Sequence, residues 1–405
     1  MINVITLFSG YDSQCLALRR LGVEFDLVAW SEIDPAAIKA HNALFPEYSK
    51  RNLGDITCVD WQEFRRFHPD NIDILTYSSP CQDFSQAGRQ RGGEQGSGTR
   101  SSLLWEVERA VDAFHPKYLL MENVAALVGE KFMPLFQRWL ARLQRHGYNN
   151  YWQEMNAKDF GVPQNRKRVF VVSKFTEADT SPYYFPLPFR LESRLRDVLE
   201  NDVAERYYLS DAAIARITRN LGGRDIATTT FGISKTIVAS CAKITSFDNY
   251  VKVGNLYASE SSRQSTKTYH VNEDGSILAR YIGRDERSHP ISEEQYTSPD
   301  AQCMPTLTLS NFGKIIDRRI QAAHSGREQG KQAATIRVRR LTERELYRLM
   351  DVDEHDIDTL LASGISNTQH ARLAGNSIVV SCLYHIFDTL LLHPEPRQGQ
   401  QLKLF

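Results

Sequence analysis

Short apolar runs alternate with amphipathic stretches through the first 175 residues, and this alternation constrains the fold more than any other feature. The apolar runs are strand candidates, and they lie at residues 4–8, 26–30, 72–77, 118–121 and 168–173. The amphipathic stretches are helix candidates, and they lie at residues 14–20, 35–42, 105–114 and 132–144. This alternation predicts an α/β fold with a doubly wound, mostly parallel sheet covered by helices. Such sheets bind ligands at the carboxyl ends of their strands, so we expect a functional site there.

The alternation stops at the proline-rich residues 182–188, which marks a domain boundary. The next 150 or so residues are rich in Thr, Ser and Gly, with β-like runs at 236–239 and 250–253. They predict a smaller, irregular, β-containing domain inserted into the α/β fold, because helical periodicity returns at 342–350 and 377–392. The predicted organisation is a main domain formed by residues 1–188 and 363–393, an inserted domain at 189–362, and a flexible tail at 394–405.

The formal net charge is zero, because 49 Lys and Arg residues balance 49 Asp and Glu residues. Bulk charge therefore does not predict a nucleic-acid ligand, although a local patch still can. Residues 311–340 hold eight Lys and Arg residues against only Asp317 and Glu328. Taken alone, this stretch fits a solvated basic surface as well as a phosphate-binding one.

The absence of membrane-spanning, export and disulfide signals in the sequence indicates the cellular compartment. No run of about 18 apolar residues occurs, so we expect no membrane span. The segment Met1-Ile2-Asn3-Val4-Ile5 lacks the charged region of an export signal and reads as a buried strand. The six cysteines are scattered without a C-x-x-C pair, which argues against a disulfide framework and a zinc site. We therefore expect a cytoplasmic protein without a bound metal.

Cys81 lies in Ser79-Pro80-Cys81-Gln82, directly after the predicted strand at 72–77. A cysteine in this position is usually a buried packing residue. Here Pro80 fixes the preceding backbone, and residues 82–101 are polar, contain five glycines and offer almost no apolar anchor. A long loop of this kind is usually functional or disordered. A nucleophile at the base of a loop that closes over a substrate is the alternative to a core cysteine.

Two further segments place ionisable side chains beside predicted strands. Glu122 follows the apolar run at 118–121, where partial burial would raise its pKa and make it a proton donor. A helix N-cap or a surface carboxylate is an equally good interpretation of that residue. Arg166 and Arg168 alternate before the strand at 168–173, so both should face one side and could hold a base oxygen or a phosphate. The alternative is a solvated strand edge.

The first strand ends in Phe8-Ser9-Gly10-Tyr11-Asp12-Ser13 and leads into a helix, a tight turn that a cofactor can approach. The full G-x-G-x-x-G pattern is missing, so dinucleotide binding is only weakly indicated. Glu32 ends the second strand, where an acid can bind ribose hydroxyls.

Taken in chain order, these segments resemble the sequence blocks of the bacterial and phage C5-cytosine DNA methyltransferase family. The matching segments are Phe8-Ser9-Gly10, Glu32, Asn52-Leu53-Gly54-Asp55-Ile56, Pro80-Cys81-Gln82, Glu122-Asn123-Val124, Gln164-Asn165-Arg166-Lys167-Arg168, Arg340-Leu341-Thr342-Glu343-Arg344-Glu345 with Leu349-Met350, and Gly375-Asn376-Ser377. Single tripeptides are weak signals, but eight blocks in family order across most of the chain are a specific one.

The resemblance implies transfer of a methyl group from S-adenosylmethionine to cytosine C5 in duplex DNA, as in restriction-modification systems. It makes Cys81 the nucleophile on C6, Glu122 the proton donor to N3, and Arg168, with Arg166, the group that orients the base. It also implies a set of cofactor-binding residues: Phe8, Gly10, Tyr11, Glu32, Ile33, Asp55, Ile56, Pro80, Leu103, Asn376 and Ser377.

The same resemblance implies that the target base is flipped out of the duplex, because its C5 atom is inaccessible in a stacked helix. Residues 189–362 correspond to a target-recognition domain, whose basic end at 318–340 fits phosphate contacts. The DNA-contacting residues that we predict are Gln82, Ser85, Arg100, Thr306 and Thr308.

One departure from the family pattern concerns the first turn, which usually reads F-x-G-x-G-G. Asp12 and Ser13 replace the second and third glycines here. The turn must therefore accommodate two Cβ atoms, and we interpret the change as subfamily variation because Glu32, Asp55 and Asn376 remain.

The tail ends in Gln401-Leu402-Lys403-Leu404-Phe405, which resembles the Q-L-x-L-F peptide that binds the bacterial replication sliding clamp. Apolar side chains at Leu402, Leu404 and Phe405 could insert into a groove of a partner. A chance sequence at a free end is the alternative. We otherwise expect a monomer.

Three competing functions have to be weighed. A tRNA cytosine-5 methyltransferase of the same fold would have a smaller recognition region than the roughly 170 residues present here. A non-catalytic DNA-binding relative should have lost Cys81, Glu122 or Arg168, and all three are present. A pyrimidine C5-modifying synthase also uses a cysteine on C6, but it needs neither the inserted domain nor the basic stretch. The DNA enzyme is therefore preferred.

Overall fold

The structure is a computed structural model that describes residues 1–68, 71–80, 100–220, 233–237, 239, 250–253, 257–261, 265–271, 277–284, 290–297 and 337–395. The chain divides into two compact units. The sheet unit comprises Met1–Ser193, Thr236–Ala242 and Glu343–Phe405. The inserted unit comprises Arg194–Lys235 and Lys243–Thr342.

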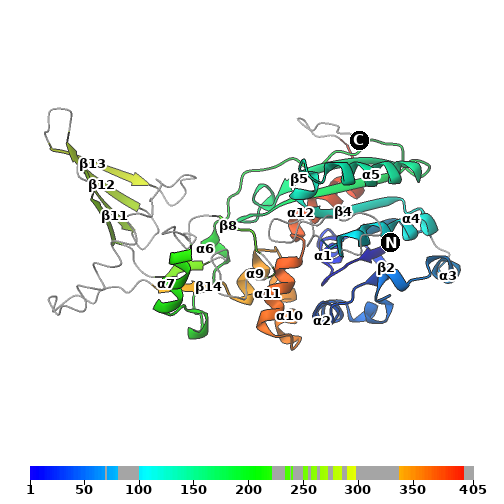
Figure 1. The fold of residues 1–405 in the computed structure, drawn as a ribbon, viewed down its shortest axis with the longest axis horizontal. Coiled ribbons are helices and arrows are strands. Elements are labelled where there is room, and N and C mark those ends of the chain that lie inside the picture. The colour runs from blue at the N-terminus through cyan, green and yellow to red at the C-terminus, as the bar shows by residue number, and fades with distance from the viewer. Residues whose placement is uncertain are drawn as a thin grey trace. The chain divides into compact units, whose positions relative to one another are not determined.

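A six-stranded sheet in the order β2-β1-β3-β4-β7-β5 forms the centre of the sheet unit (Figure 1). Its strands are β1 (Ile2–Leu7), β2 (Phe25–Ser31), β3 (Ile74–Tyr77), β4 (Tyr118–Val124), β5 (Tyr148–Asn156) and β7 (Lys167–Phe175). Strands β2, β1, β3 and β4 are parallel, whereas β7 is antiparallel to its neighbours β4 and β5. The predicted α/β fold with a mostly parallel sheet is confirmed.

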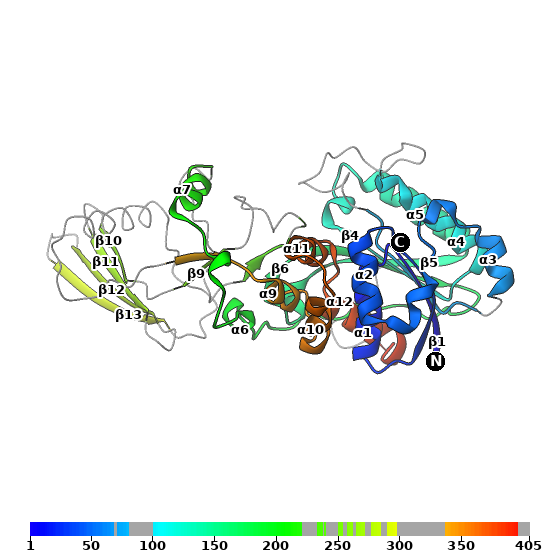
Figure 2. The same ribbon diagram turned by 90° about the horizontal axis from the view of Figure 1, so that it is seen from below.

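Helices cover both faces of this sheet, with α4 and α5 on one side and α1 and α12 on the other (Figure 2). The helices of the first 193 residues are α1 (Ser13–Arg20), α2 (Pro35–Leu44), α3 (Trp61–Phe67), α4 (Val107–Phe114) and α5 (Met133–Arg145). Those that follow the inserted unit are α9 (Glu343–Arg348), α10 (Glu354–Ala362), α11 (Asn367–Asn376) and α12 (Val380–Phe387). The apolar stripes of α4 and α5 bury Val107, Val111 and Trp139 against the sheet, and the Trp139 indole donates to the Tyr77 hydroxyl at 3.0 Å.

Strand β5 and helices α3, α10 and α11 were not predicted from the sequence. Strand β5 is at the edge of the sheet and mixes Asn149 and Asn150 with aromatic residues, so no apolar run marks it. Helix α11 buries only one large apolar side chain, Leu373, beside His370 and the small Ala371 and Ala374, which weakens its helical pattern.

The segment from Glu343 onward returns to the sheet unit, so the second boundary lies at residue 343 instead of the predicted 363. Ion pairs hold this segment to α1: the Arg19 guanidinium lies 2.6 Å from Asp356, and Arg20 bonds to both Asp351 and Asp353. Buried Leu346, in α9, contributes apolar packing. Helix propensity is a local property, so the sequences of α9 and α10 do not predict which of the two units these helices pack in.

Residues Asn367–Leu392 are, by length and composition alone, long and apolar enough to cross a membrane. The helix is interrupted between Asn376 and Val380, and 61% of its most apolar window is buried inside the protein. Helix α12 packs against α1. The segment therefore has the properties of a core element of the sheet unit.

The inserted unit contains a four-stranded antiparallel sheet in the order β10-β11-β12-β13. Its strands are β10 (Tyr257–Ser261), β11 (Ser265–Val271), β12 (Ile277–Arg284) and β13 (Pro290–Thr297). A second pair joins β9 (Tyr250–Val253), the strand predicted at 250–253, to β14 (Arg337–Arg340). The unit also holds α6 (Leu195–Val198) and α7 (Asp211–Asn220), and Ile217, Tyr250 and Val338 form a small core.

Candidate active site

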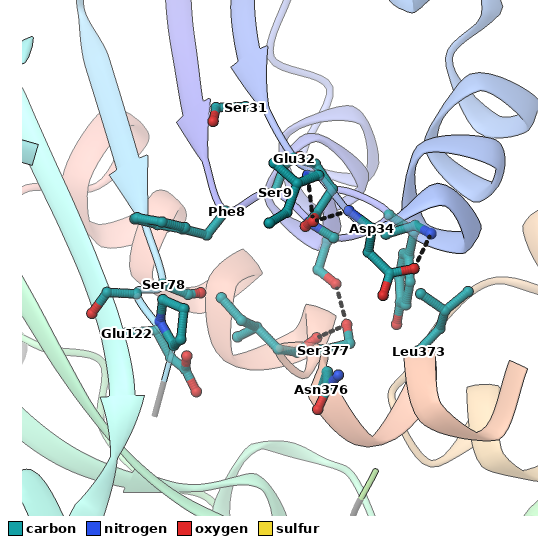
Figure 3. Close-up of a pocket in the computed structure, with 18 of the residues that line it drawn as sticks. Phe8, Ser9, Ser31, Glu32, Asp34, Ser78, Glu122, Leu373, Asn376 and Ser377 are labelled. Carbon is teal, nitrogen blue, oxygen red and sulfur yellow. Dashed lines mark hydrogen bonds between the residues drawn. The ribbon is translucent and has the colours of Figure 1, made fainter. Parts of the chain in front are cut away.

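A cavity of about 570 Å³ opens at the carboxyl ends of β1, β2, β3 and β4 in the sheet unit (Figure 3). Parallel strands end at the same edge of a sheet, which is why residues far apart in the sequence meet there. All eleven residues predicted to bind the cofactor line this cavity. Among them, Asn376 is the last residue of α11, Ser377 follows it directly, and Leu103 comes from a 3₁₀ helix (Arg100–Glu106).

Glu32 connects the two strand-to-helix turns on one side of the cavity. One carboxylate oxygen accepts from the backbone N–H of Gly10 at 3.0 Å. The other accepts from the N–H groups of Ile33 and Asp34, each at 2.8 Å. Gly10 has φ = 60°, a left-handed conformation that glycine adopts at little cost. The carboxylate therefore fixes the first turn in a shape that leaves its backbone open to the cavity.

The departure at Asp12 has a structural explanation. Asp12 is fully buried and also has a left-handed backbone, with φ = 67°. Its carboxylate caps α1 by accepting from the N–H of Cys15 at 3.2 Å and accepts from the Thr6 hydroxyl at 2.7 Å. His41 lies 3.5 Å from the same carboxylate. These interactions offset the strain of a side chain at a position where the family usually has glycine.

Ser13, which replaces the third glycine of the family pattern, forms a hydrogen bond with another residue that lines the cavity. Its hydroxyl lies 2.7 Å from the hydroxyl of Ser377. The bond joins the start of α1 to the segment after α11, so the replacement of glycine adds a link between two parts of the chain that line the cavity.

Glu122 and Arg168 form an ion pair within the cavity, with Nε of Arg168 3.0 Å from Oε1 of Glu122. The pair is set by the antiparallel register of β4 and β7, in which Val124 is opposite Arg168. Burial raises the pKa of Glu122 above its ordinary value, although the positive charges of Arg168 and Arg166 oppose the shift. The site thus holds a carboxyl group with an enhanced tendency to carry a proton.

Arg166 also lines the cavity, but it has different partners from Arg168. Its guanidinium donates to the backbone carbonyls of Ile237 at 2.7 Å, Gly375 at 3.0 Å and Ser377 at 2.6 Å. Arg166 precedes β7 and its N–H donates to the Asn156 side chain, so it lies outside the regular strand that carries Arg168. The two arginines are therefore built into the site in different ways.

Several predicted residues lie outside the described part of the chain. They are Cys81, Gln82, Ser85, Thr306 and Thr308, together with the tail residues Gln401, Leu402, Leu404 and Phe405. Pro80, directly before Cys81, lines the cavity, and Arg100 begins the 3₁₀ helix that carries Leu103. Within the described ranges, no group of three or more His, Cys, Asp or Glu side chains could hold a metal ion.

The cavity residues that sequence reasoning missed include one ion pair. Arg372, on α11, lies 2.6 Å from the carboxylate of Asp34, which caps α2. Both residues line the cavity. The only sequence signal was that Arg372 lies three residues before Gly375, the first residue of a segment that resembles a family block. This position does not predict that Asp34, 338 positions away, is its partner.

Comparison with known proteins agrees with this fold and cavity. The family model described as C-5 cytosine-specific DNA methylase matches residues 2–391. The chain therefore belongs to the C-5 cytosine-specific DNA methylase family, and it is an enzyme of the DNA (cytosine-5) methyltransferase class.

Individual relatives support the assignment. The type II methyltransferase M2.ScrFI of Lactococcus lactis is 28% identical, over 96% of this chain and 99% of the relative. The orphan methyltransferase M.SPRI of Bacillus phage SPR is 27% identical, over 96% of this chain and 97% of the relative. The S. pombe Dnmt2 methyltransferase structure has a TM-score of 0.61 at 17% identity, covering 97% of this chain and 99% of that one, which shows a shared fold.

Proposed function

We propose that the chain transfers a methyl group from S-adenosylmethionine to C5 of a cytosine flipped out of duplex DNA, through a covalent bond between Cys81 and C6. The observation that carries the proposal is the convergence of Glu122, Arg168 and the eleven predicted cofactor residues on one cavity. Pro80, which precedes Cys81 in the sequence, lines the same cavity.

The cavity fits the proposed cofactor in size and in chemistry. Its volume of about 570 Å³ is within the range of small-molecule sites. The acids Glu32 and Asp55 would accept from ribose hydroxyls and the adenine amine, and Ile33, which is 65% exposed, offers an apolar surface for the base. The buried Ser9 hydroxyl has no hydrogen-bond partner among the described residues, so a polar group of a ligand could satisfy it. When bound, the cofactor supplies the methyl group.

The protein residues would activate the base. The Cys81 thiolate forms a bond to C6 while N3 gains a proton from Glu122, which turns C5 into a nucleophile. Arg168 holds the Glu122 carboxyl group in place through their ion pair, and it would orient the oxygen of the bound base. After methylation, water takes up the C5 proton, the sulfur–C6 bond breaks to release the Cys81 thiolate, and N3 returns its proton to Glu122. Covalent catalysis of this kind divides one difficult step into easier ones.

The inserted unit is the proposed DNA-reading part of the protein. Its basic end at residues 318–340 and the pair Thr306 and Thr308 remain our predicted DNA contacts, together with Gln82, Ser85 and Arg100. Phosphate contacts would position the duplex, and base contacts would select the sequence.

The substrate class is tested by incorporation of radiolabelled methyl groups from S-adenosylmethionine into duplex DNA and into tRNA. We expect incorporation into duplex DNA alone. Labelling of tRNA without labelling of DNA would replace the proposal by a tRNA methyltransferase of the same fold.

Glu32 gives a direct prediction for cofactor binding. Substitution Glu32→Gln replaces an acceptor oxygen by an amide N–H, so either the Gly10 N–H or the N–H pair of Ile33 and Asp34 loses its acceptor. Hydrogen bonds to charged groups contribute about 1.5–3 kcal/mol, so the Kd for S-adenosylhomocysteine should rise ~10- to 100-fold. Isothermal titration calorimetry measures this, with the exposed Glu47→Gln as the control. Equal affinity of both variants would contradict the role of Glu32.

The tail sequence supports a second partner. We propose that Gln401, Leu402, Leu404 and Phe405 bind the groove of a bacterial sliding clamp, which would recruit the enzyme to newly replicated DNA. A labelled peptide of residues 394–405 should bind a purified clamp saturably in a fluorescence anisotropy assay, and a peptide with Leu404→Ala and Phe405→Ala should not. Equal signals from the two peptides would reject the proposal.

A further inference from the structure

One short segment of the chain leaves the inserted unit and joins the sheet unit. Residues Thr236–Ala242 belong to the sheet unit, whereas the chain on both sides, Arg194–Lys235 and Lys243–Thr342, belongs to the inserted unit. Ile237, within this segment, is fully buried. The segment is covalently connected at both ends to the inserted unit. A displacement of the inserted unit therefore acts on a segment that is packed in the sheet unit.

The segment is held by three consecutive residues that precede β7. The Ile237 N–H donates to the Gln164 side chain at 3.0 Å, and the Thr236 hydroxyl donates to the Asn165 carbonyl at 2.7 Å. The Arg166 guanidinium donates to the Ile237 carbonyl at 2.7 Å. Both polar groups of the Ile237 backbone are thus bonded to side chains of the sheet unit.

The same guanidinium is part of the cavity wall. Arg166 donates from its other terminal nitrogen to the carbonyls of Gly375 and Ser377, and the Ser377 hydroxyl is bonded to Ser13. A planar guanidinium with fixed donor directions cannot move toward one carbonyl without changing its geometry to the others. The position of the 236–237 segment and the shape of the wall at 375–377 are therefore linked through one side chain.

We propose that Arg166 is a positioning residue that couples the docked segment Thr236–Ile237 to the cofactor-binding wall at Gly375–Ser377. The inference rests on the proposed function, since it assigns the cavity to the cofactor. Because the chain on both sides of the segment belongs to the inserted unit, DNA engagement by that unit would alter cofactor affinity through this linkage.

The test compares three variants of the full-length chain by isothermal titration calorimetry with S-adenosylhomocysteine. Thr236→Val removes the bond to Asn165 although Thr236 does not line the cavity, and the Kd should rise about three- to tenfold, the effect of one lost hydrogen bond. Thr176→Val is the matched control, because it removes a hydroxyl bond to the Gly147 carbonyl away from the cavity and should change the Kd by less than about twofold. Arg166→Lys should raise the Kd at least about tenfold, because lysine cannot reach three carbonyls in fixed directions.

The double variant Thr236→Val with Arg166→Lys separates coupling from general destabilisation. If Thr236 acts through Arg166, the double variant should bind no more weakly than Arg166→Lys alone. Additive effects, or equal affinity of Thr236→Val and Thr176→Val, would overturn the coupling while leaving the proposed function intact. Failure of the wild-type protein to bind S-adenosylhomocysteine would instead reject the proposed function, and this inference with it. Thermal unfolding without ligand identifies any variant that has lost its fold. If Arg166→Lys has lost its fold, the comparison of Thr236→Val with Thr176→Val decides the test.

Discussion

Replacing Cys81 by alanine is expected to reduce methyl transfer to duplex DNA to background, a loss of at least ~10³-fold, because in the proposed mechanism its thiolate forms the bond that activates C5. Alanine removes only one sulfur atom, so the circular dichroism spectrum and the affinity for S-adenosylhomocysteine should be unchanged. Cys58→Ala is the matched control, since Cys58 is an exposed free cysteine that does not line the cavity. It should retain wild-type methyl incorporation.

A trapping experiment examines the covalent bond itself. When S-adenosylmethionine is present, C5 of a 5-fluorocytosine at the target position gains a methyl group but cannot then lose fluorine, so the enzyme should remain attached to the DNA. We expect a stable protein–DNA adduct with the wild type and with Cys58→Ala, and none with Cys81→Ala. Methyl incorporation near the wild-type rate by Cys81→Ala would remove Cys81 from the mechanism.

Glu122→Gln should lower the rate of methyl transfer by about 10²- to 10⁴-fold, the usual contribution of a positioned proton donor. The amide preserves the size of the side chain but cannot supply a proton to N3, and it also leaves Arg168 without its anionic partner. Single-turnover measurements with saturating DNA and cofactor report this chemical step. The exposed Glu154→Gln on β5 serves as the control and should behave as the wild type.

The pH dependence of the same rate follows from the raised pKa of Glu122. A carboxyl group whose pKa is raised by burial keeps its proton to higher pH than an ordinary glutamic acid. The rate should therefore fall as the pH rises through that raised pKa, and the residual rate of Glu122→Gln should lack this step. A wild-type and a Glu122→Gln profile of the same shape would argue against proton donation by Glu122.

The sequence predicted the parts of the fold that apolar periodicity encodes. The strands and the residues at their carboxyl ends followed from this pattern, and for that reason Phe8, Glu32 and Glu122 were expected near one another. Parallel strands carry such residues to the same edge, so sequence order was enough to bring them to one cavity. The resemblance to a known family added Asp55, Asn376 and Ser377, which no periodicity would have placed there.

Other features depend on contacts between distant segments and left no local signal. The bonds of Arg166 to Ile237 and Gly375, and the ion pair of Arg372 with Asp34, join positions that no pattern relates. The left-handed backbone of Asp12 could not be predicted from the sequence either, because it depends on hydrogen bonds of its side chain to Thr6 and to the start of α1. The boundary at residue 343 depends on where α9 packs, which is a tertiary property.

The central claim is that this chain methylates cytosine at C5 in DNA. Bisulfite sequencing of plasmid DNA tests it most directly, using a host that lacks cytosine methyltransferases and expresses either the wild type or Cys81→Ala. We predict that cytosines in one recurrent sequence context resist conversion in DNA from the wild-type cells, and that all cytosines convert in DNA from the Cys81→Ala cells. Complete conversion in both would contradict the claim, and equal protection in both would contradict the assigned nucleophile.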